Sequence, residues 1–486
     1  MKKLSFLLTV FILLLSLKFA AQKNGLQKIV TADRSQGDGF GWAVSVSGDY
    51  AVAGSVAKSK VLNEAILKEA GAAYIFKRES SGKWTEMQKL EPGVIKADDY
   101  FGGSVSINGI YAVVGSCGED NAKESDAGIR MGAVYVYSLL KGKWIKVQKL
   151  ELAKKEKQDN FGYSVSVSEK YIVIGCPGRN MKQGNFSESS GAVYVYEISK
   201  SGWIPMQEIV ASPGSGFWFG RTVSVSGNNL VVGTANGGRV SVYEVENGRW
   251  TLKSTLKATE AADIGFGTAI GIWNTKLIVG ADGDYDYFEG AERPNTDSVM
   301  EIMNEEANGQ FTKLILPNNK QLRDSFGVKP EQFKSLAKPV ETLEARKKRM
   351  AGAGAVYIYN RAENGNWILE ERIVPKGISN DDHFGASVNI SDSLVIVGSP
   401  GDKIKGKAIK DNYYAGAVYV YKKNKEGKWL ETKKITASKR NVLAKFGLAT
   451  GLWQKRIIIG ARYEAGDAAE KAVKPEAGAA YICDEK

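Results

Sequence analysis

The sequence predicts an all-β fold: a seven-bladed β-propeller built from four-stranded antiparallel blades. Three observations predict it. A Phe-Gly motif recurs seven times, each copy opens the first of four short apolar runs, and the two ends of the chain together supply one complete repeat.

Each run within a repeat has a composition typical of a strand. The second run is β-branched and ends in glycine, as in YAVVGS from Tyr111. The third run alternates aromatic and β-branched residues after a glycine. The fourth starts at a turn glycine and a tryptophan, as in GKWIKVQKL from Gly142. Four such strands make one blade, and the blades open at Phe40, Phe101, Phe161, Phe219, Phe266, Phe384 and Phe446.

The chain ends predict how the ring closes. The last repeat stops after its third run, GAAYIC from Gly478, and an unmatched run, LQKIV from Leu26, precedes the first Phe-Gly. We expect this N-terminal strand to complete the last blade, which closes the ring and leaves no open sheet edge.

The longest interruption is an insertion at about residues 282–350, within the fifth repeat. Its C-terminal part carries apolar residues at helical spacing, and residues 324–327 repeat the Phe-Gly opening, so we interpret it as a partly helical, eroded repeat. Eight blades, one of them degenerate, are therefore the alternative. Pro330 and a Lys/Arg-rich helix stand where two inner strands would be needed, which favours seven.

The N-terminus predicts export. Lys2 and Lys3 precede an apolar run from Leu4 to Leu17, which is shorter than the roughly 20 residues that span a bilayer, and Ala20 and Ala21 follow. Residues 1–21 are thus expected to be a secretory signal peptide, with a retained anchor as the alternative, and the propeller to span 22–486. No other segment is apolar for long enough to be transmembrane, so we expect a periplasmic or extracellular protein.

The net charge of +12 could favour anionic polymers, but lysines recur in every turn and outer strand, which indicates solubility instead. No nucleic-acid partner is expected. Of the three cysteines, Cys117 and Cys176 follow the second strand of successive blades and could form a disulfide, whereas Cys483 falls in a third strand and is expected to be buried.

The chain resembles the FG-GAP repeat β-propeller family, which includes the head of integrin α subunits. Phe-Gly opens each repeat, and Gly-x-Pro follows the second strand in full at Gly175–Pro177 and Gly398–Pro400. Integrin-like repeats carry a calcium loop between strands one and two. Here that connection is a tight turn, as in SGDY from Ser47, so calcium cannot be carried over, and the variant resembles bacterial exported FG-GAP proteins.

Loop length separates the two faces of the disc. Turns between strands one and two and between strands three and four are short, so all long connections share the other face, where binding is expected. The residue before each Phe-Gly should lie at the mouth of the central channel on that face. Tyr100, Trp218 and His383 at this position are candidate ligand-binding residues, and packing between blades is the alternative.

Other repeated residues are expected to be structural. Asp38, Asp99, Asp159 and Asp382, two residues before the Phe, are predicted to cap the turn that enters strand one. The tryptophan that opens each fourth strand is predicted to be scaffold.

A metal site and catalysis find weaker support. Asp282, Asp284 and Asp286 alternate in GADGDYDYFEG, a spacing that could place three carboxylates around calcium, although the EF-hand pattern fails and a solvated acidic loop is the alternative. No other cofactor is expected. With one histidine in the chain and no Gly-x-Ser-x-Gly motif, an enzyme is not expected.

The sequence therefore favours an exported, non-enzymatic binding or adhesion propeller that recognises a protein or glycan through its long-loop face. One alternative is a hydrolase or lyase that acts on an anionic polysaccharide. The other is a structural subunit of a cell-envelope complex, with the insertion as a docking arm.

Overall fold

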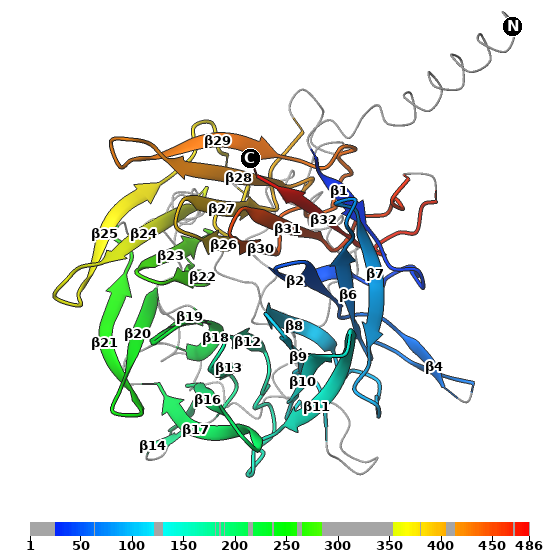
Figure 1. Cartoon of the computed structure of the whole chain (residues 1–486), viewed down its shortest axis with the longest axis horizontal. Coiled ribbons are helices and arrows are strands. Elements are labelled where there is room, and N and C mark those ends of the chain that lie inside the picture. The colour runs from blue at the N-terminus through cyan, green and yellow to red at the C-terminus, as the bar shows by residue number, and fades with distance from the viewer. Residues whose placement is uncertain are drawn as a thin grey trace, which may run out of the picture. The chain divides into compact units, whose positions relative to one another are not determined.

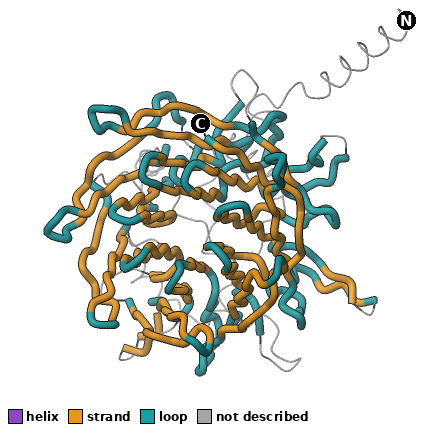
Figure 2. The backbone as a smooth tube through the Cα atoms, viewed as in Figure 1, coloured by secondary structure: helices purple, strands orange, loops and turns teal. Residues whose placement is uncertain are grey.

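The computed structural model describes residues 25–62, 64–120, 130–179, 181–183, 186–188, 190–211, 217–235, 238–259, 265–283, 353–379, 381–404, 414–469 and 472–485. These residues contain strands and loops and no helix (Figure 2). Accordingly, no helix in this described part of the chain is long and apolar enough to cross a membrane.

The described residues form seven four-stranded antiparallel sheets, arranged as blades around a central axis (Figure 1). The innermost strands are β2 (Phe40–Ser47), β8 (Phe101–Asn108), β12 (Ser164–Val167), β18 (Phe217–Ser226), β22 (Phe266–Trp273), β26 (Ser387–Ile390) and β30 (Thr450–Trp453). The second strands are β3 (Tyr50–Ser55), β9 (Tyr111–Ser116), β13 (Tyr171–Cys176), β19 (Asn229–Ala235), β23 (Lys276–Ala281), β27 (Leu394–Ser399) and β31 (Arg456–Ala461).

The third strands are β6 (Ala72–Arg78), β10 (Ala133–Leu140), β16 (Ala192–Ser199), β20 (Arg239–Glu246), β24 (Ala355–Arg361), β28 (Ala417–Lys423) and β32 (Ala479–Asp484). The outer strands are β7 (Trp84–Leu90), β11 (Lys143–Leu150), β17 (Gly202–Val210), β21 (Arg249–Lys257), β25 (Trp367–Ile373), β29 (Trp429–Ile435) and β1 (Gln27–Ile29). Two additional hairpins pair β4 (Lys60–Leu62) with β5 (Ala65–Leu67) and β14 (Met181–Gln183) with β15 (Phe186–Glu188).

Ring closure follows the predicted exchange of strands. β1 pairs with β32, so the first strand of the chain is the outer strand of the last blade. The closure extends beyond the sheet: Lys28 Nζ lies 3.3 Å from a carboxylate oxygen of Glu464, and the Arg34 guanidinium donates to the carbonyls of Glu464 and Ala465 at 3.0 and 2.7 Å. The seven-bladed prediction is confirmed, and so is closure by the N-terminal strand.

The Phe-Gly motif joins adjacent blades. All seven phenylalanines are buried, and the glycine that follows takes a left-handed conformation, as at Gly102 with φ 89°. A Cβ at Gly102 would lie 2.3 Å from the carbonyl oxygen of Ala72 in the preceding blade, and one at Gly54 would lie 1.9 Å from that of Gly102. Glycine is therefore required at both motif positions, because neighbouring backbones meet there without room for a side chain.

The inner strands are tied together by serine and threonine hydroxyls. Ser104, Ser164, Thr222 and Ser387 each donate to the carbonyl of the Phe-Gly glycine in the next blade, at 2.7–2.9 Å. A second serine accepts a main-chain N–H from the next blade, as Ser106 does from Val167 at 3.1 Å. The Val-Ser-Val-Ser pattern thus satisfies backbone groups between blades.

The outer strands are joined by an amide clamp. The Gln148 side chain donates to the carbonyl of Trp203 at 2.7 Å and accepts its N–H at 2.9 Å, and Trp203 belongs to the next blade. The pairs Gln27–Trp84, Gln88–Trp144 and Gln207–Trp250 repeat this arrangement. The repeated tryptophans are 1–7% exposed, which confirms their prediction as scaffold.

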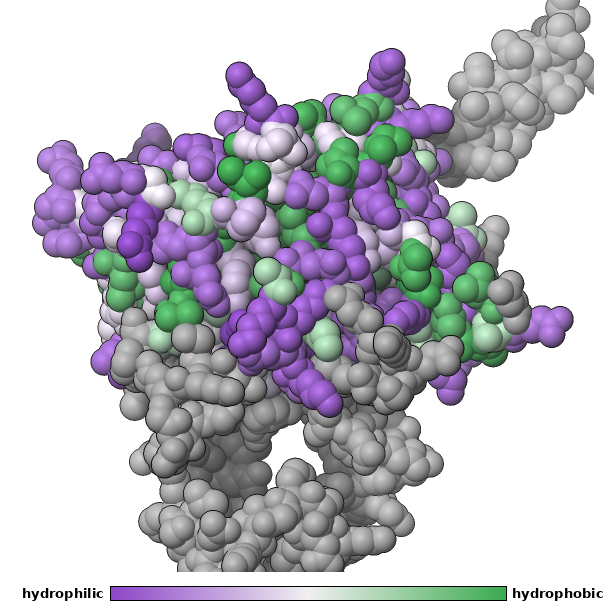
Figure 3. All heavy atoms as spheres, turned by 90° about the horizontal axis from the view of Figure 1, so that it is seen from below, coloured by the Kyte–Doolittle hydropathy of each residue, from purple (hydrophilic) through white to green (hydrophobic). Residues whose placement is uncertain are grey.

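The outer rim is mostly hydrophilic with scattered apolar side chains (Figure 3). On the outer strands β11 and β17, Ile145, Val147 and Ile204 are each a little under half exposed. Partly exposed apolar side chains are common on the surfaces of folded proteins.

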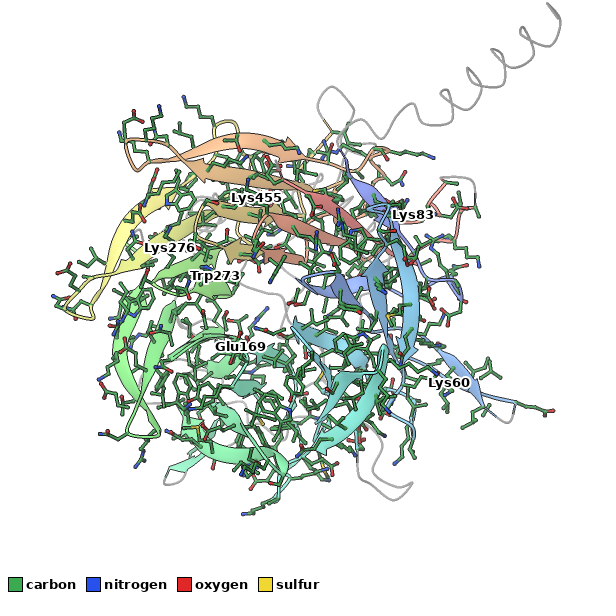
Figure 4. The ribbon with its side chains drawn as sticks, viewed as in Figure 1. Lys60, Lys83, Glu169, Trp273, Lys276 and Lys455 are labelled. Carbon is green, nitrogen blue, oxygen red and sulfur yellow. The ribbon has the colours of Figure 1, made fainter. Side chains whose placement is uncertain are left out.

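The two faces differ as predicted. Two-residue turns join β2 to β3 and β8 to β9, while the longer connections run from second to third strands and between blades. In Figure 4, Glu169 in the β12–β13 turn and Trp273 at the end of β22 lie near the axis, and Lys60 projects outward on the β4–β5 hairpin. We call the opposite face, with the longer connections, the long-loop face.

Two other predictions about the scaffold can be compared with the structure. Cys176 is a buried thiol that donates to the carbonyl of Asp159 at 3.1 Å, so it is not in a disulfide with Cys117. Cys483 is buried, as predicted. The insertion interrupts blade five between β23 and β24; residues 284–352, with the expected helix, and residues 1–21 lie outside the described residues.

Candidate functional site

The residues directly before the Phe-Gly pairs, here called the pre-Phe residues, share one backbone conformation on the long-loop face. All seven have positive φ, between 49° and 76°. Only two of them are glycine, although glycine is the residue that adopts this conformation without steric cost. The seven are Gly39, Tyr100, Asn160, Trp218, Gly265, His383 and Lys445.

Main-chain hydrogen bonds between blades fix these residues. The N–H of Tyr100 donates to the carbonyl of Glu69 at 3.1 Å, and Lys445 donates to Tyr414 at 2.9 Å. Glu69 and Tyr414 lie at the end of the connection between the second and third strands of the preceding blade, and each also has a positive φ of 50°. The backbones of Tyr100 and Lys445 are therefore held beside a loop of the preceding blade.

Tyr100 has both an acidic and a basic neighbour. Its hydroxyl donates to the Glu69 carboxylate at 3.0 Å, and the Arg130 guanidinium carbon lies 5.4 Å from its ring centroid. Burial, together with the nearby Glu69 carboxylate, raises the pKa of Tyr100 to about 12. The phenol therefore stays protonated at neutral pH and can donate a hydrogen bond.

Trp218 and His383 each pair with a second ring. Trp218 makes an edge-to-face contact with Tyr163 of the preceding blade, with centroids 6.2 Å apart. His383 stacks on Tyr414 at 5.8 Å, and its Nε2 lies 3.3 Å from the Tyr414 hydroxyl oxygen.

The three predicted ligand-binding residues consequently lie on blades two, four and six, each with its own neighbours. They share one face but not one local cluster. The ring contacts of Trp218 and His383 agree with the alternative that these residues pack between blades. Ligand binding by the three residues stays a prediction.

The aspartates two residues before the Phe are turn caps, as predicted. Each is 0–3% exposed and accepts the main-chain N–H of the residue three positions earlier, at 2.6–2.8 Å. Their carbonyls accept a side-chain hydrogen bond from the end of the second strand, as Asp99 does from Ser116 at 2.9 Å. The four are Asp38, Asp99, Asp159 and Asp382.

The charge beside these aspartates changes from blade to blade. Lys58 Nζ lies 2.8 Å from Asp38, and Arg179 lies 3.1 Å from Asp159, whereas Glu119 follows the second strand at the corresponding place in blade two. Burial raises the pKa of Asp99 to about 7, and Glu119 adds to the increase. Blade two thus holds a buried carboxyl group that titrates near neutral pH.

The predicted calcium ligands are only partly within the described residues. Asp282 follows β23 and is half-buried, while Asp284 and Asp286 lie outside the described residues. Across the described ranges, no group of three or more His, Cys, Asp or Glu side chains could hold a metal ion. The Asp282 site remains a prediction.

Blade six contains a polar pocket of about 300 Å³. Two of its acids have partners within the protein: Asp382 accepts from Ser379, and Asp402 accepts from Arg440 at 2.7 Å and from the Tyr419 hydroxyl at 3.2 Å. Lys434 at its wall pairs with Asp402. These internal partners indicate a structural ion-pair network rather than a reactive centre.

Sequence reasoning missed several aromatic and basic neighbours of the pre-Phe residues. Arg130 and Tyr414 stand two residues before the glycine that opens a third strand, while Trp42 and Tyr163 follow directly after Phe-Gly. Aligning the seven repeats at those positions would have identified them, because the Phe-Gly and Gly-Ala motifs fix the register.

Comparison with known proteins supports the repeat assignment. Residues 25–76, 84–137, 144–196 and 367–421 match the FG-GAP repeat family. No curated protein matches the chain.

Among solved structures, the chain is similar to that of U3-55K, at 8% identity and a TM-score of 0.48, covering 94% of this chain and 98% of that one. It is also similar to the RRP9 WD40 repeats, at 8% identity and a TM-score of 0.48, covering 95% of this chain and 98% of that one.

Proposed function

Because this chain is a seven-bladed β-propeller that carries FG-GAP repeats, we propose that it is an exported, non-catalytic binding or adhesion protein that holds a protein or glycan on its long-loop face. A rigid disc that presents variable side chains at equivalent positions is well suited to this role.

The observation that carries the proposal is the comparison between the pre-Phe residues. Gly39 and Gly265 demonstrate that the fold accepts glycine in this conformation, yet Tyr100, Trp218 and His383 occupy the same left-handed backbone. A bulky residue costs of order 1 kcal/mol more than glycine there. Local ring contacts offset part of that cost, and contact with a ligand is the further gain that we infer.

We infer the absence of a catalytic role from the hydrogen bonds of the buried aspartates. The buried aspartates Asp38, Asp99, Asp159 and Asp382 all accept main-chain hydrogen bonds within their own turns. Carboxylates that are committed to turn geometry are poorly placed to exchange protons with a substrate. This supports a binding protein over a hydrolase or lyase.

Export is proposed from the N-terminal sequence. The apolar run from Leu4 to Leu17 behind Lys2 and Lys3 is typical of a signal peptide. A propeller in the periplasm or outside the cell would meet glycans and surface proteins directly.

The test compares the two faces of the full mature chain on glycan and peptide arrays. One variant carries Tyr100→Gly, Trp218→Gly and His383→Gly on the long-loop face. The control carries Glu169→Gln, Lys276→Gln and Lys455→Gln in the short turns.

We expect saturable binding by the wild type that the control retains and the long-loop variant loses. If the control variant lost binding and the long-loop variant kept it, the binding site would lie on the short-turn face, and the proposal would be overturned.

A further inference from the structure

The residue directly after each Phe-Gly pair, here called the post-Gly residue, lies in the same turn as the pre-Phe residue. Its N–H donates to the pre-Phe carbonyl, as Tyr163 does to Asn160 at 3.0 Å and Thr268 to Gly265 at 2.9 Å. All seven post-Gly residues are half-buried, and Arg221 in blade four is the only charged one. The seven are Trp42, Gly103, Tyr163, Arg221, Thr268, Ala386 and Leu448.

The backbone of Arg221 is fixed on both sides. The carbonyl of Gly220, directly before it, accepts the hydroxyl of Ser164 in blade three at 2.8 Å. Thr222, directly after it, donates its hydroxyl to the carbonyl of Gly267 in blade five at 2.9 Å. Arg221 is therefore held between two neighbouring blades, and little main-chain freedom is left to lose when a ligand binds.

A post-Gly side chain lies toward the end of the second strand in the preceding blade. A Cβ at Gly103 would be 3.5 Å from Cγ2 of Val56, which directly follows β3. Trp42 likewise packs on Arg462, which directly follows β31. The equivalent neighbour of Arg221 is the residue after β13, which is a buried proline at position 177 and carries no charge.

The guanidinium of Arg221 has no hydrogen-bond, ion-pair or ring partner within the ranges that the structure describes. Other arginines of the scaffold pair with carboxylates. Arg361 lies 2.8 Å from Glu244. Arg440 lies 2.7 Å from Asp402. Because a half-buried cation has lost part of its hydration, an anion on a ligand would replace what burial removes.

The surrounding turns supply no carboxylate to Arg221. None of the pre-Phe and post-Gly residues is acidic. In blade three, Asp159 precedes the pre-Phe residue, but it is fully buried, accepts the N–H of Glu156 at 2.7 Å and lies 3.1 Å from Arg179. Its charge is thus neutralised within blade three.

Two aromatic rings adjoin the position of Arg221. Trp218 is the pre-Phe residue of the same turn, and it contacts Tyr163, the post-Gly residue of blade three. The rings meet edge to face, with centroids 6.2 Å apart and 74° between their planes, and each is half-buried. Such a pair offers apolar surface to one side chain, but it does not offer parallel ring faces to a row of sugars.

We propose that Arg221 binds the carboxylate of an Asp or Glu side chain in an acidic peptide segment, while the Tyr163–Trp218 pair packs against an apolar residue beside it. A guanidinium forms two parallel hydrogen bonds with one carboxylate. A single charged post-Gly residue suits one acidic side chain better than a polyanion, which is bound by a row of cations. This inference rests on the proposed function and names its ligand class.

The test uses pairs of heptapeptides that differ only in a central Glu or Gln, with Leu, Phe or Trp beside it. Binding to the full mature chain is measured by isothermal titration, and oligogalacturonate is titrated as an acidic glycan. We expect the Glu peptide of at least one pair to bind about tenfold more tightly than its Gln partner, as one charge-assisted contact predicts. This preference should shrink as salt rises, because salt screens exposed charges.

Arg221→Gln should remove the preference, so that both members of the pair bind equally. Arg221→Lys should keep part of it, because an ammonium group retains the charge but not the two-pronged geometry. A ratio measured within one variant isolates the contact between residue 221 and the carboxylate from a partial loss of folding. The matched control is Arg249→Gln, an exposed arginine of the same blade beside the turn from β20 to β21, which should keep the full preference.

No preference for Glu in any pair, or a preference that Arg221→Gln leaves unchanged, would overturn the assignment. Binding of oligogalacturonate that depends on Arg221, without a Glu preference in the peptides, would also overturn it, since the ligand would then be an acidic glycan. Both outcomes leave the proposed function intact. Binding of no peptide or glycan by the wild type would contradict both proposals.

Discussion

The Arg462 guanidinium of blade seven stacks on the Trp42 ring of blade one, with 3.6 Å between the guanidinium carbon and the ring centroid. This contact crosses the junction where the ring closes, close to the strand exchange between β1 and β32. One buried side chain therefore links the last blade to the first.

Replacing Arg462 by lysine should lower the free energy of unfolding by about 1 kcal/mol. An ammonium group cannot lie flat between Trp42 and Tyr463 as a guanidinium does. Chemical denaturation measures the change, with Lys455→Arg in an exposed turn as the control. Equal stability of Arg462→Lys and the wild type would contradict this account of the junction.

Closure should also depend on the buried ion pair between Lys28 and Glu464. Their side chains are 6% and 0% exposed, so Glu464→Gln removes a buried carboxylate from beside an ammonium group and should cost about 3 kcal/mol. The control is Lys170→Gln, which removes the exposed pair with Glu197 and should cost less than about 1 kcal/mol. Equal losses in equilibrium unfolding would indicate that the pair is not a closure element.

The amide clamp between blades two and three predicts a third loss of stability. Gln148→Leu removes both hydrogen bonds to the backbone of Trp203 and should cost about 1–3 kcal/mol, because buried peptide groups are left unpaired. Val147→Thr, on the exposed side of the same strand, should change stability by less than about 0.5 kcal/mol. Denaturation curves that coincide for the two variants would contradict the clamp.

Asp99 should make stability depend on pH. Its pKa is raised to about 7 by burial, against about 3.9 in an unfolded chain, so the folded state holds the proton more tightly. Stability should therefore fall as pH rises from about 4 to about 7, and the loss should be complete above that range.

Asp99→Asn keeps a neutral acceptor for the Lys96 N–H and should remove this part of the pH dependence. Melting temperatures from pH 4 to pH 8 test it, with Asp392→Asn at an exposed turn as the control. A constant difference between Asp99→Asn and the wild type over this range would show that Asp99 does not titrate there.

The repeated parts of the fold were predictable from the sequence because the same motifs occur in each repeat at the same spacing. Phe-Gly, the Val-Ser strand and the turn tryptophan each recur in register, and LQKIV from Leu26 has no place except the last blade. The caps at Asp38 and Asp99 were predictable for the same reason, since a short acceptor just before a strand suits a turn.

The side-chain neighbours on the long-loop face were not predictable in the same way. The contacts of Trp42 with Arg462 and of His383 with Tyr414 join residues that are far apart in the chain, and the loops that carry Arg462 and Tyr414 vary in length between blades. The left-handed conformation of Tyr100 and His383 was also missed, because propensity alone assigns it to glycine.

The central claim is that the bulky pre-Phe residues contribute more to ligand binding than to the stability of the fold. The most direct measurement compares the unfolding free energy of the Tyr100→Gly, Trp218→Gly and His383→Gly variant with its array binding.

The account predicts stability within about 1 kcal/mol of the wild type, since glycine relieves the left-handed backbone as it removes ring contacts, and loss of binding. Wild-type binding together with a loss of several kcal/mol would contradict it, and would identify these residues as packing between blades.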